Sequence, residues 1–362
     1  MRQVILKGRG SAETLCIGGG APVSIQTMWK EGIVPVLGDG RVLAALLNRI
    51  EQLRDLGCGI LRFAVPDEAS ADALRLIAER SVLPLVADIH FDYRLALRVL
   101  QGDSRVAKVR INPGNIGSKE RVRRVADACA ARGVPIRIGV NTGSFPRDIA
   151  SRVASGRLSR AEGLSETALR EAAVLEDLGF TAIVVSMKST SVEETIAANE
   201  AFAAKSGIPL HIGVTEAGPL IGGVVKNTLA ISRLLGEHIG ATVRVSLSSS
   251  PENEVIAAGE ILRECGLRKG GVRIISCPRC GREGFDVRSF VEKHEAALLS
   301  CKKDALVAVM GCEVNGPGEA AHADLGITGA GDGAVIFKHG KIVRRVRSEC
   351  ADKEFMEELE SL

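Results

Sequence analysis

Eight short apolar runs recur along the first 250 residues, and each is followed by a segment with helical periodicity. The runs are almost continuous in aliphatic residues, which is the pattern of strands buried on both faces of a parallel sheet. Several of the helical segments end at a glycine, a residue that readily forms a left-handed C-cap. The runs occupy residues 23–28, 60–65, 83–89, 105–111, 134–140, 181–187, 208–214 and 242–248.

This alternation predicts a (β/α)₈ TIM barrel, because eight strand–helix units in about 250 residues have the size and rhythm of that fold. A doubly wound open sheet is the alternative. The barrel is favoured because polar residues follow most of the strands, whereas an open sheet would gather them at one switch point. Aromatic residues make up only 3% of the chain, so aliphatic side chains and alanine must fill the core.

The pattern changes after Cys265, where we expect a second and smaller α/β domain. Its first apolar run ends at Cys277, and a helix over about 287–299 and a strand over 305–311 follow. A hairpin then turns at His339 and Gly340, and a polar helix ends the chain. The predicted domains are therefore a barrel over residues 1–268 and an α/β domain over residues 269–362.

Charge and composition exclude several classes of partner. A net charge of +3 is no argument for nucleic-acid or membrane binding. The opening MRQVILKGRG lacks the apolar stretch and cleavage site of a signal peptide, and no apolar run is long enough to span a bilayer. We therefore expect a cytoplasmic protein with reduced thiols. Four of its nine cysteines, Cys16, Cys58, Cys129 and Cys265, stand among apolar or small neighbours, as buried unreactive side chains do.

Basic side chains interrupt strands that otherwise consist of core residues. A buried arginine without a partner is costly, and guanidinium groups bind phosphate oxygens in pairs. Because the carboxyl ends of barrel strands open on one mouth, the pattern predicts a site for a phosphorylated, preferably diphosphorylated, small substrate. Ion pairs with Asp67, Asp88 or Glu216 are the alternative. The residues expected to bind the substrate are Arg62, Arg110, Asn112, Arg137, Asn141, Lys188, Arg244 and Ser246.

His90 and Glu216 are the candidates for proton transfer. His90 follows the third strand between Asp88 and Asp92, so it is either a proton donor or a histidine packed at the rim. Glu216 is the carboxylate near the end of the seventh strand and is a candidate acid or base. Lys188 would be a Schiff-base lysine in a lyase or aldolase, but a phosphate contact is the preferred interpretation.

Cys277 and Cys280 form the pair CPRC, whose spacing suits one metal or one disulfide. A zinc ribbon requires a second close pair of ligands, which the sequence lacks, and a thioredoxin motif requires different β/α surroundings. A third sulfur is available at Cys312, followed by a glycine-rich turn at residues 316–318. Three cysteines and such a turn fit an iron–sulfur cluster with an atypical fourth ligand, for which Glu319 is the obvious candidate.

Seven motifs of the chain closely resemble the bacterial 4-hydroxy-3-methylbut-2-enyl diphosphate synthases. Members of that family perform the penultimate step of the methylerythritol phosphate route to isoprenoids. The motifs occur in the family's order, and the resemblance runs from about residue 4 to residue 329, nearly the whole chain. They are ADIHFDYRLA, RINPGNIG, IRIGVNTGS, GVTEAG, RVSL, CPRCGREGFDV and GCEVNGPGEA.

The resemblance implies a TIM barrel followed by an iron–sulfur domain similar to those of sulfite and nitrite reductases. It implies reductive ring opening of 2-C-methyl-D-erythritol 2,4-cyclodiphosphate with loss of water, with electrons from flavodoxin or ferredoxin. The strand-end cations and Ser246 would hold the diphosphate, and Glu216 would face the reacting carbons. It further implies a homodimer in which the cluster domain of one subunit caps the barrel of the other. The implied ligands of a [4Fe-4S] cluster are Cys277, Cys280, Cys312 and Glu319.

Two stretches depart from the family pattern. QTMWKEGIVPVL stands where a Thr-Asn-Thr stretch is usual, so we place no site residue at the rim around Trp29. Glu313 follows Cys312 where an apolar residue is usual, and it competes with Glu319 as a ligand. Two rival functions are kept open: a barrel lyase or aldolase with a structural zinc, and an electron-transfer module carried by a scaffold barrel.

Overall fold

The computed structural model describes all residues except 9–11, 279–283, 313–315, 317 and 319. The chain forms two compact units, Met1–Arg268 and Lys269–Leu362. Across the described ranges, no helix combines the length and the apolar character that a membrane span needs.

The larger unit is a closed parallel barrel. Its strands follow the hydrogen-bonded order β8-β7-β6-β5-β4-β3-β10-β9, and a parallel bridge between Val185 and Leu210 joins the two ends of that order. The alternative of an open doubly wound sheet is therefore wrong, and the expected TIM barrel is confirmed. The strands are β3 (Ser24–Met28), β4 (Cys58–Ala64), β5 (Leu85–Asp88), β6 (Lys108–Ile111), β7 (Ile136–Asn141), β8 (Ile183–Lys188), β9 (His211–Ile212) and β10 (Thr242–Val243).

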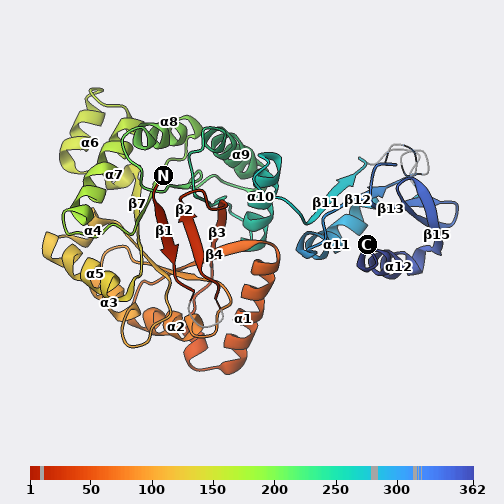
Figure 1. Ribbon diagram of the computed structural model, residues 1–362, viewed down its shortest axis with the longest axis horizontal. Helices are drawn as coiled ribbons and strands as arrows, with labels where there is room; N and C mark the ends of the chain where they lie inside the picture. The colour runs from red at the N-terminus through yellow and green to blue at the C-terminus, as the bar shows by residue number, and fades with distance from the viewer. Residues whose placement is uncertain (9–11, 279–283, 313–315, 317, 319) are drawn as a thin grey trace. The chain divides into compact units, whose positions relative to one another are not determined.

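Helices surround these strands on the outside (Figure 1). Many begin at a side chain that caps a free backbone N–H group; Ser159 and Glu162 form a reciprocal capping box at one of them. Gly133 ends another in the left-handed conformation that favours glycine. The main helices are α1 (Gly40–Asp55), α2 (Glu68–Ala78), α3 (Tyr93–Val99), α5 (Lys119–Arg132), α7 (Arg160–Glu176), α8 (Val192–Ala203), α9 (Leu220–Gly236) and α10 (Pro251–Glu264).

Three parts of the barrel differ from the sequence prediction. β9 and β10 are two residues long each, far shorter than the runs at 208–214 and 242–248. Gly213 has a φ of 143°, which ends the regular ladder after β9. The long loop after β7 contains an additional helix, α6 (Arg147–Ala154), which buries Ile149. Short turns η1 (Val34–Leu37), α4 (Pro113–Ile116) and η2 (Thr142–Ser144) complete the unit.

An N-terminal hairpin closes one end of the barrel. β1 (Gln3–Leu6) and β2 (Leu15–Gly18) pair antiparallel, and the Arg2 N–H group donates to the Gly207 carbonyl at 2.6 Å. Gly207 precedes β9, so the hairpin covers the amino-terminal ends of the strands. The buried cluster that joins it to the barrel consists of Val4, Leu6, Ile17, Ile60, Val86, Val184 and Ala241.

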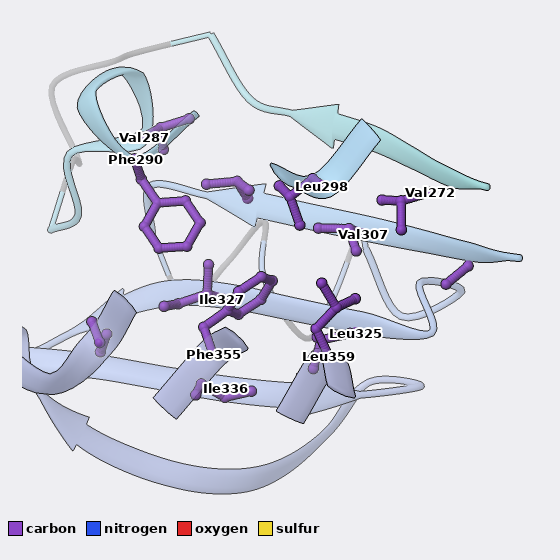
Figure 2. Packing of buried hydrophobic residues seen from close by; sticks show 14 residues of the cluster. Val272, Val287, Phe290, Leu298, Val307, Leu325, Ile327, Ile336, Phe355 and Leu359 are labelled. Atoms are coloured by element: carbon purple, nitrogen blue, oxygen red, sulfur yellow. The ribbon is translucent and has the colours of Figure 1, made fainter. Parts of the chain in front are cut away.

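The smaller unit is a mixed five-stranded sheet with the order β11-β12-β13-β14-β15. The first three strands are parallel and the last three are antiparallel. Phe290 and Phe355 pack edge to face, with ring centroids 5.3 Å apart, in the core with Ile327 and Ile336 (Figure 2). The elements are β11 (Val272–Ser276), α11 (Val287–Ser300), β12 (Ala305–Met310), β13 (Leu325–Ala330), β14 (Gly333–Lys338), β15 (Lys341–Arg347), η4 (Ser348–Cys350) and α12 (Ala351–Glu360).

β13 was not predicted, because its sequence LGITGA resembles a glycine-rich turn. Leu325 and Ile327 are nevertheless fully buried, since β13 is the central strand of the sheet. The predicted hairpin turn is confirmed: His339 and Gly340 have φ values of 48° and 74° and connect β14 to β15.

Gly326 on β13 generates a stability prediction. A Cβ atom built there would lie 2.1 Å from Cζ of Phe337, and that ring is fully buried. We expect Gly326→Ala to lower the free energy of unfolding of the smaller unit by about 1–3 kcal/mol, the usual cost of overpacking. Chemical denaturation measures it. In a Phe337→Leu background the cost should shrink; an equal cost in both backgrounds would contradict this explanation.

Candidate active site

Parallel pairing places the strand-end cations in one layer of the barrel. Asp88 on β5 is level with Arg110 on β6, which is level with Arg137 on β7. Because every second residue of a barrel strand points inward, all three side chains enter the interior near the carboxyl ends of the strands. They line a cavity of about 270 Å³. The predicted site residues that line it are Arg62, His90, Arg110, Arg137, Asn141, Lys188, Arg244 and Ser246.

Asp88 pairs with two of the arginines at the base of this cavity. Its carboxylate lies 2.9 Å from Arg110 Nη1 and 3.5 Å from Arg62 Nε. Burial alone would raise the pKa of Asp88, but the charge of Arg62, together with His90 and Arg110, holds it well below its usual range. Asp88 therefore stays ionised. His90 is half-exposed at the rim, and its Nε2 atom lies 3.0 Å from Arg110 Nη1.

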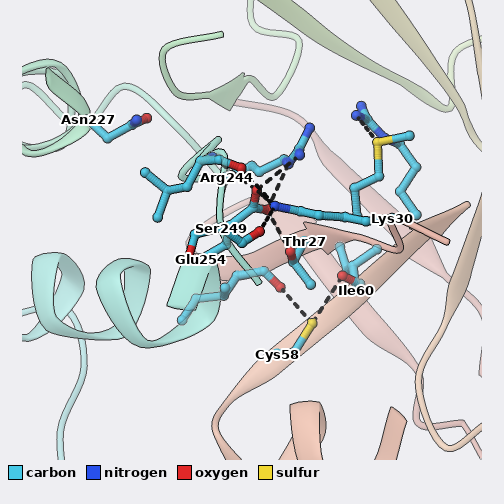
Figure 3. A network of polar contacts seen from close by, with 12 residues as sticks. Thr27, Lys30, Cys58, Ile60, Asn227, Arg244, Ser249 and Glu254 are labelled. Atoms are coloured by element: carbon cyan, nitrogen blue, oxygen red, sulfur yellow. Dashed lines mark hydrogen bonds and ion pairs between the residues drawn. The ribbon is translucent and has the colours of Figure 1, made fainter. Parts of the chain in front are cut away.

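Glu254 is a second buried carboxylate, and the sequence analysis missed it. It lies in the first turn of α10, which begins at the mouth because it follows the last strand. Its oxygens accept hydrogen bonds from Thr27 Oγ1 at 2.7 Å and from the Leu247 N–H group at 3.0 Å. Figure 3 shows Arg244 and Lys30 converging on it, at 3.2 and 3.0 Å. The sequence signal that could have identified Glu254 is its position in the first turn of a helix that follows a strand end.

The cavity nevertheless keeps an excess of positive charge. Five basic side chains line it, namely those of Arg62, Arg110, Arg137, Lys188 and Arg244. In the part of the chain that the structure describes, Asp88 and Glu254 are the carboxylates that form ion pairs with them.

Two basic side chains of this set, those of Arg137 and Lys188, form no ion pair among the described residues. Arg137 is fully buried, and its Nε and Nη2 atoms have no hydrogen-bond partner within the described ranges. Burial lowers the pKa of Arg137 and of Lys188 well below the usual range, and the neighbouring arginines lower both further. An anion in this cavity would supply the missing partners.

Gly139 allows Arg110 to reach this position. A Cβ atom on Gly139 would lie 2.4 Å from Arg110 Nε, so the guanidinium group rests directly on the glycine backbone of β7. Any larger residue at this position would displace Arg110 from Asp88.

Asn112 and Glu216 do not line the cavity. Asn112 is buried at the start of α4, directly after β6, and its Oδ1 atom lacks a partner among the residues described. Glu216 is exposed in the loop after β9 with a φ of 49°, although its neighbour Thr215 does line the cavity. Asn227 of α9 holds this loop by accepting a hydrogen bond from the Val214 N–H group at 2.9 Å.

The loop around Trp29, where no site residue was predicted, lines an adjoining hollow of about 780 Å³. Trp29 stacks on Phe63 with ring centroids 5.7 Å apart, and the Arg49 guanidinium lies 5.0 Å from its ring. Met28 and Arg244 line both this hollow and the cationic cavity. The rim is thus apolar on the side of β3 and cationic toward the barrel axis.

Two of the predicted cysteine ligands lie at one end of the smaller sheet. Cys277 directly follows β11, and Cys312 follows the adjacent parallel strand β12. The Gly311 N–H group donates to Cys277 Sγ at 3.1 Å. Two soft donors on neighbouring strand ends fit an iron–sulfur group. No cluster of three or more His, Cys, Asp or Glu side chains that could hold a metal is found in the described ranges; Cys280, Glu313 and Glu319 lie outside them.

Fold and site together define a barrel protein with a buried cationic mouth, joined to an α/β unit that carries cysteines at its strand ends. The chain belongs to the GcpE family: the GcpE TIM-barrel domain matches residues 10–259, and the GcpE protein C-terminal domain matches residues 273–361. A relative from Treponema pallidum is 56% identical over 377 residues, covering 100% of this chain and 92% of its own length.

Further relatives are similar over nearly the whole chain. One from Treponema denticola is 50% identical and covers 100% of this chain and 98% of its own length. One from Lawsonia intracellularis is 46% identical, with coverages of 95% and 93%. All three relatives are named 4-hydroxy-3-methylbut-2-en-1-yl diphosphate synthase (flavodoxin).

Lys108 lies deeper in the barrel than the cavity and generates a second prediction. It is fully buried, and its Nζ atom has no partner among the described residues. Burial lowers the pKa of Lys108 well below its usual range, and Arg137 and Arg62 add to the effect. We expect Lys108→Met to raise the free energy of unfolding of the unliganded protein by about 1–3 kcal/mol, because it removes an unsatisfied polar group.

The pH dependence checks the cause. A base whose pKa is lower in the folded state costs least when it is neutral in both states, so wild-type stability should rise as the pH approaches the normal lysine range. Lys108→Met should show a smaller rise between pH 7 and pH 9. Lys226→Met, on the exposed face of α9, serves as the control and should behave as the wild type. A destabilised Lys108→Met protein would show that Lys108 has an unseen partner.

Proposed function

We propose that this chain is a 4-hydroxy-3-methylbut-2-en-1-yl diphosphate synthase. It would open the ring of 2-C-methyl-D-erythritol 2,4-cyclodiphosphate and release water, consuming two electrons and two protons. The names of the relatives support the activity and flavodoxin as the electron donor; ferredoxin is the other donor of this class. The observation that carries the proposal is the excess of buried cations in the barrel mouth.

The cations hold the two phosphates of the substrate. Arg62 and Arg110 are already oriented by Asp88, so they lose little freedom on binding. Arg137 gains a partner for the Nε and Nη2 atoms that have none among the described residues, and an anion favours the charged form of Lys188, which burial and neighbouring arginines disfavour. Fixing both phosphates leaves the carbon skeleton in one position at the mouth. The proposed contacts are Arg62, Arg110, Asn112, Arg137, Asn141, Lys188, Arg244 and Ser246.

His90 and Glu216 are the proposed proton-transfer groups. Arg110 and Asp88 both contact His90 Nε2, so the ring is held at the rim of the cavity. Glu216 follows Thr215, which lines the same cavity from the loop after β9. Both residues stand at the open end, where a departing hydroxyl group needs a proton to leave as water.

Cys277, Cys280, Cys312 and Glu319 are the proposed ligands of a [4Fe-4S] cluster, with Glu313 as a competing carboxylate. When bound, this group supplies single electrons to the substrate. The Gly311 N–H group that donates to Cys277 Sγ helps to hold that sulfur in position. Following the family resemblance, we propose a homodimer in which each cluster domain serves the partner's barrel.

The ligand assignment predicts how iron content responds to substitution. Protein prepared without oxygen should be brown and contain iron and sulfide, and Cys277→Ser and Cys312→Ser should each lose most of the iron. Cys301→Ser provides the matched control, because Cys301 lies in the same unit at the end of α11 and should keep its iron. A colourless protein that contains zinc would contradict the assignment and favour a structural metal.

The assignment of Arg137 to phosphate binding predicts the kinetic effect of replacing this residue. Iron-loaded protein with reduced flavodoxin should convert the cyclodiphosphate, with the product identified by mass. Arg137→Met should lower kcat/KM by roughly 100-fold or more, since a charge-assisted contact to phosphate contributes about 1.5–3 kcal/mol and two nitrogens are free to bind. Arg233→Met, on the surface of α9, should be neutral. Unchanged kcat/KM in Arg137→Met would refute the role.

A further inference from the structure

Glu171 is a buried carboxylic acid directly behind the cationic cavity, and the proposed chemistry does not use it. It projects from α7, and 7% of its surface is exposed. Its Oε1 atom accepts a long hydrogen bond, 3.4 Å, from the Gly114 N–H group. Its Oε2 atom is buried without a hydrogen-bond partner in the part of the chain that the structure describes. No cation forms an ion pair with it in that part.

Asn112 presents a second unpartnered oxygen at the same place. A Cβ atom built on Gly114 would lie 3.1 Å from Glu171 Oε1 and 3.3 Å from Asn112 Oδ1. Both oxygens therefore lie close to one point beside this glycine. Asn112 Oδ1 has no donor within the described ranges, so a second buried acceptor without a donor lies beside the Glu171 carboxyl group. One proton resolves this arrangement, because a neutral carboxyl group can donate to the amide oxygen.

We propose that Glu171 is a proton-controlled positioning residue for the anion site. In its neutral form it donates to Asn112 Oδ1 and fixes the turn at residues 112–114, so that the amide nitrogen of Asn112 is free for a phosphate oxygen. In its ionised form it cannot donate to Asn112 Oδ1, and it places a negative charge behind Arg110. The proposal rests on the proposed function, since Asn112 and Arg110 are assigned to the diphosphate there.

The environment of Glu171 favours its neutral form, as this role requires. Burial raises the pKa of Glu171 to about 7, against smaller opposing effects of the Gly114 N–H group and Arg110. Binding of a diphosphate beside Arg110 adds negative charge nearby and raises this pKa further. By linkage, diphosphate binding takes up a proton at Glu171, and the affinity for the anion falls as the pH rises through about 7.

The surroundings of Glu171 contain few other groups that titrate near neutrality. The buried side chains of α5, α6 and α8, which pack against α7, are apolar or uncharged. Cys129 of α5 is the titratable one, and burial raises its pKa to about 12. From the strands, Arg110, Arg137 and Lys188 point toward the cavity. Titration of Lys188 is shared by wild type and any Glu171 variant, so a comparison between them isolates Glu171.

The test compares pyrophosphate binding by the full-length, iron-loaded protein at pH 6 and pH 8. Calorimetry gives the two dissociation constants. The readout is the dissociation constant at pH 8 divided by that at pH 6. We expect the ratio to be roughly fivefold or more larger in the wild type than in Glu171→Gln, a size typical of coupling between two sites. Ionisation of pyrophosphate itself is common to both proteins and cancels in this comparison. In turnover assays, the pH effect removed by Glu171→Gln should lie in KM and not in kcat.

Two further variants test whether Glu171 acts through Asn112. Glu176→Gln is the matched control: it lies on the same helix but pairs with Arg2 at the surface, and it should keep the wild-type ratio. Asn112→Ala should bind pyrophosphate more weakly and show the reduced ratio even with Glu171 present, so that adding Glu171→Gln changes little. This variant also keeps the proposal testable should Glu171→Gln fold poorly.

The outcomes separate this inference from the proposed function. Wild-type protein that binds no pyrophosphate at either pH overturns the anion site, and this proposal with it. Binding with the same pH ratio in wild type and Glu171→Gln overturns this proposal alone, because protonation of Glu171 is then not coupled to anion binding. Infrared spectra provide a ligand-free check: a protonated carboxyl band at pH 6 should disappear by pH 8 and should be missing in Glu171→Gln.

Discussion

The pairing of Asp88 with Arg62 and Arg110 is the interaction on which the barrel mouth depends. Guanidinium groups brought together in a poorly solvated interior repel one another, and a carboxylate between them offsets that repulsion. Glu254 does the same for Arg244 and Lys30 on the opposite side of the mouth. Neither carboxylate neutralises its whole neighbourhood, so the rigid strands hold a cationic cavity together without filling it. An anion that entered this cavity would meet cations whose charge is not fully compensated.

The barrel supplies this arrangement through strand register, and the residues outside the cavity refine it. Asp88, Arg110 and Arg137 are neighbours because their strands pair in parallel, whereas Gly139 and Glu171 determine how closely Arg110 and the turn after β6 can approach. Lys108 places a further basic side chain below the cavity, where burial disfavours its charged form. The charge of the mouth is thus a property of several layers, and side chains that never touch a ligand adjust it.

Much of this could be predicted from the sequence. The apolar runs gave the barrel, and arginines on those runs indicated an anion site, because a charged residue in a core strand needs a partner. Periodicity could not find β13, whose glycines hide a central strand, or α6 within a long loop. Glu254 and Glu171 were missed because they lie on helices, where a carboxylate normally faces solvent. Pairing across hundreds of residues, such as Thr27 with Glu254, leaves no local pattern.

The hairpin of β1 and β2 has a consequence for traffic through the barrel. Its apolar side chains pack over the amino-terminal ends of the strands, and among the described residues the cationic cavity is lined at the opposite, carboxyl ends. A ligand of this cavity would then enter and leave at the same end, and a product that stayed bound to the arginines would block the next substrate molecule. Reactant and product that share a phosphate anchor therefore exclude each other, and accumulation of one slows the consumption of the other by simple occupancy.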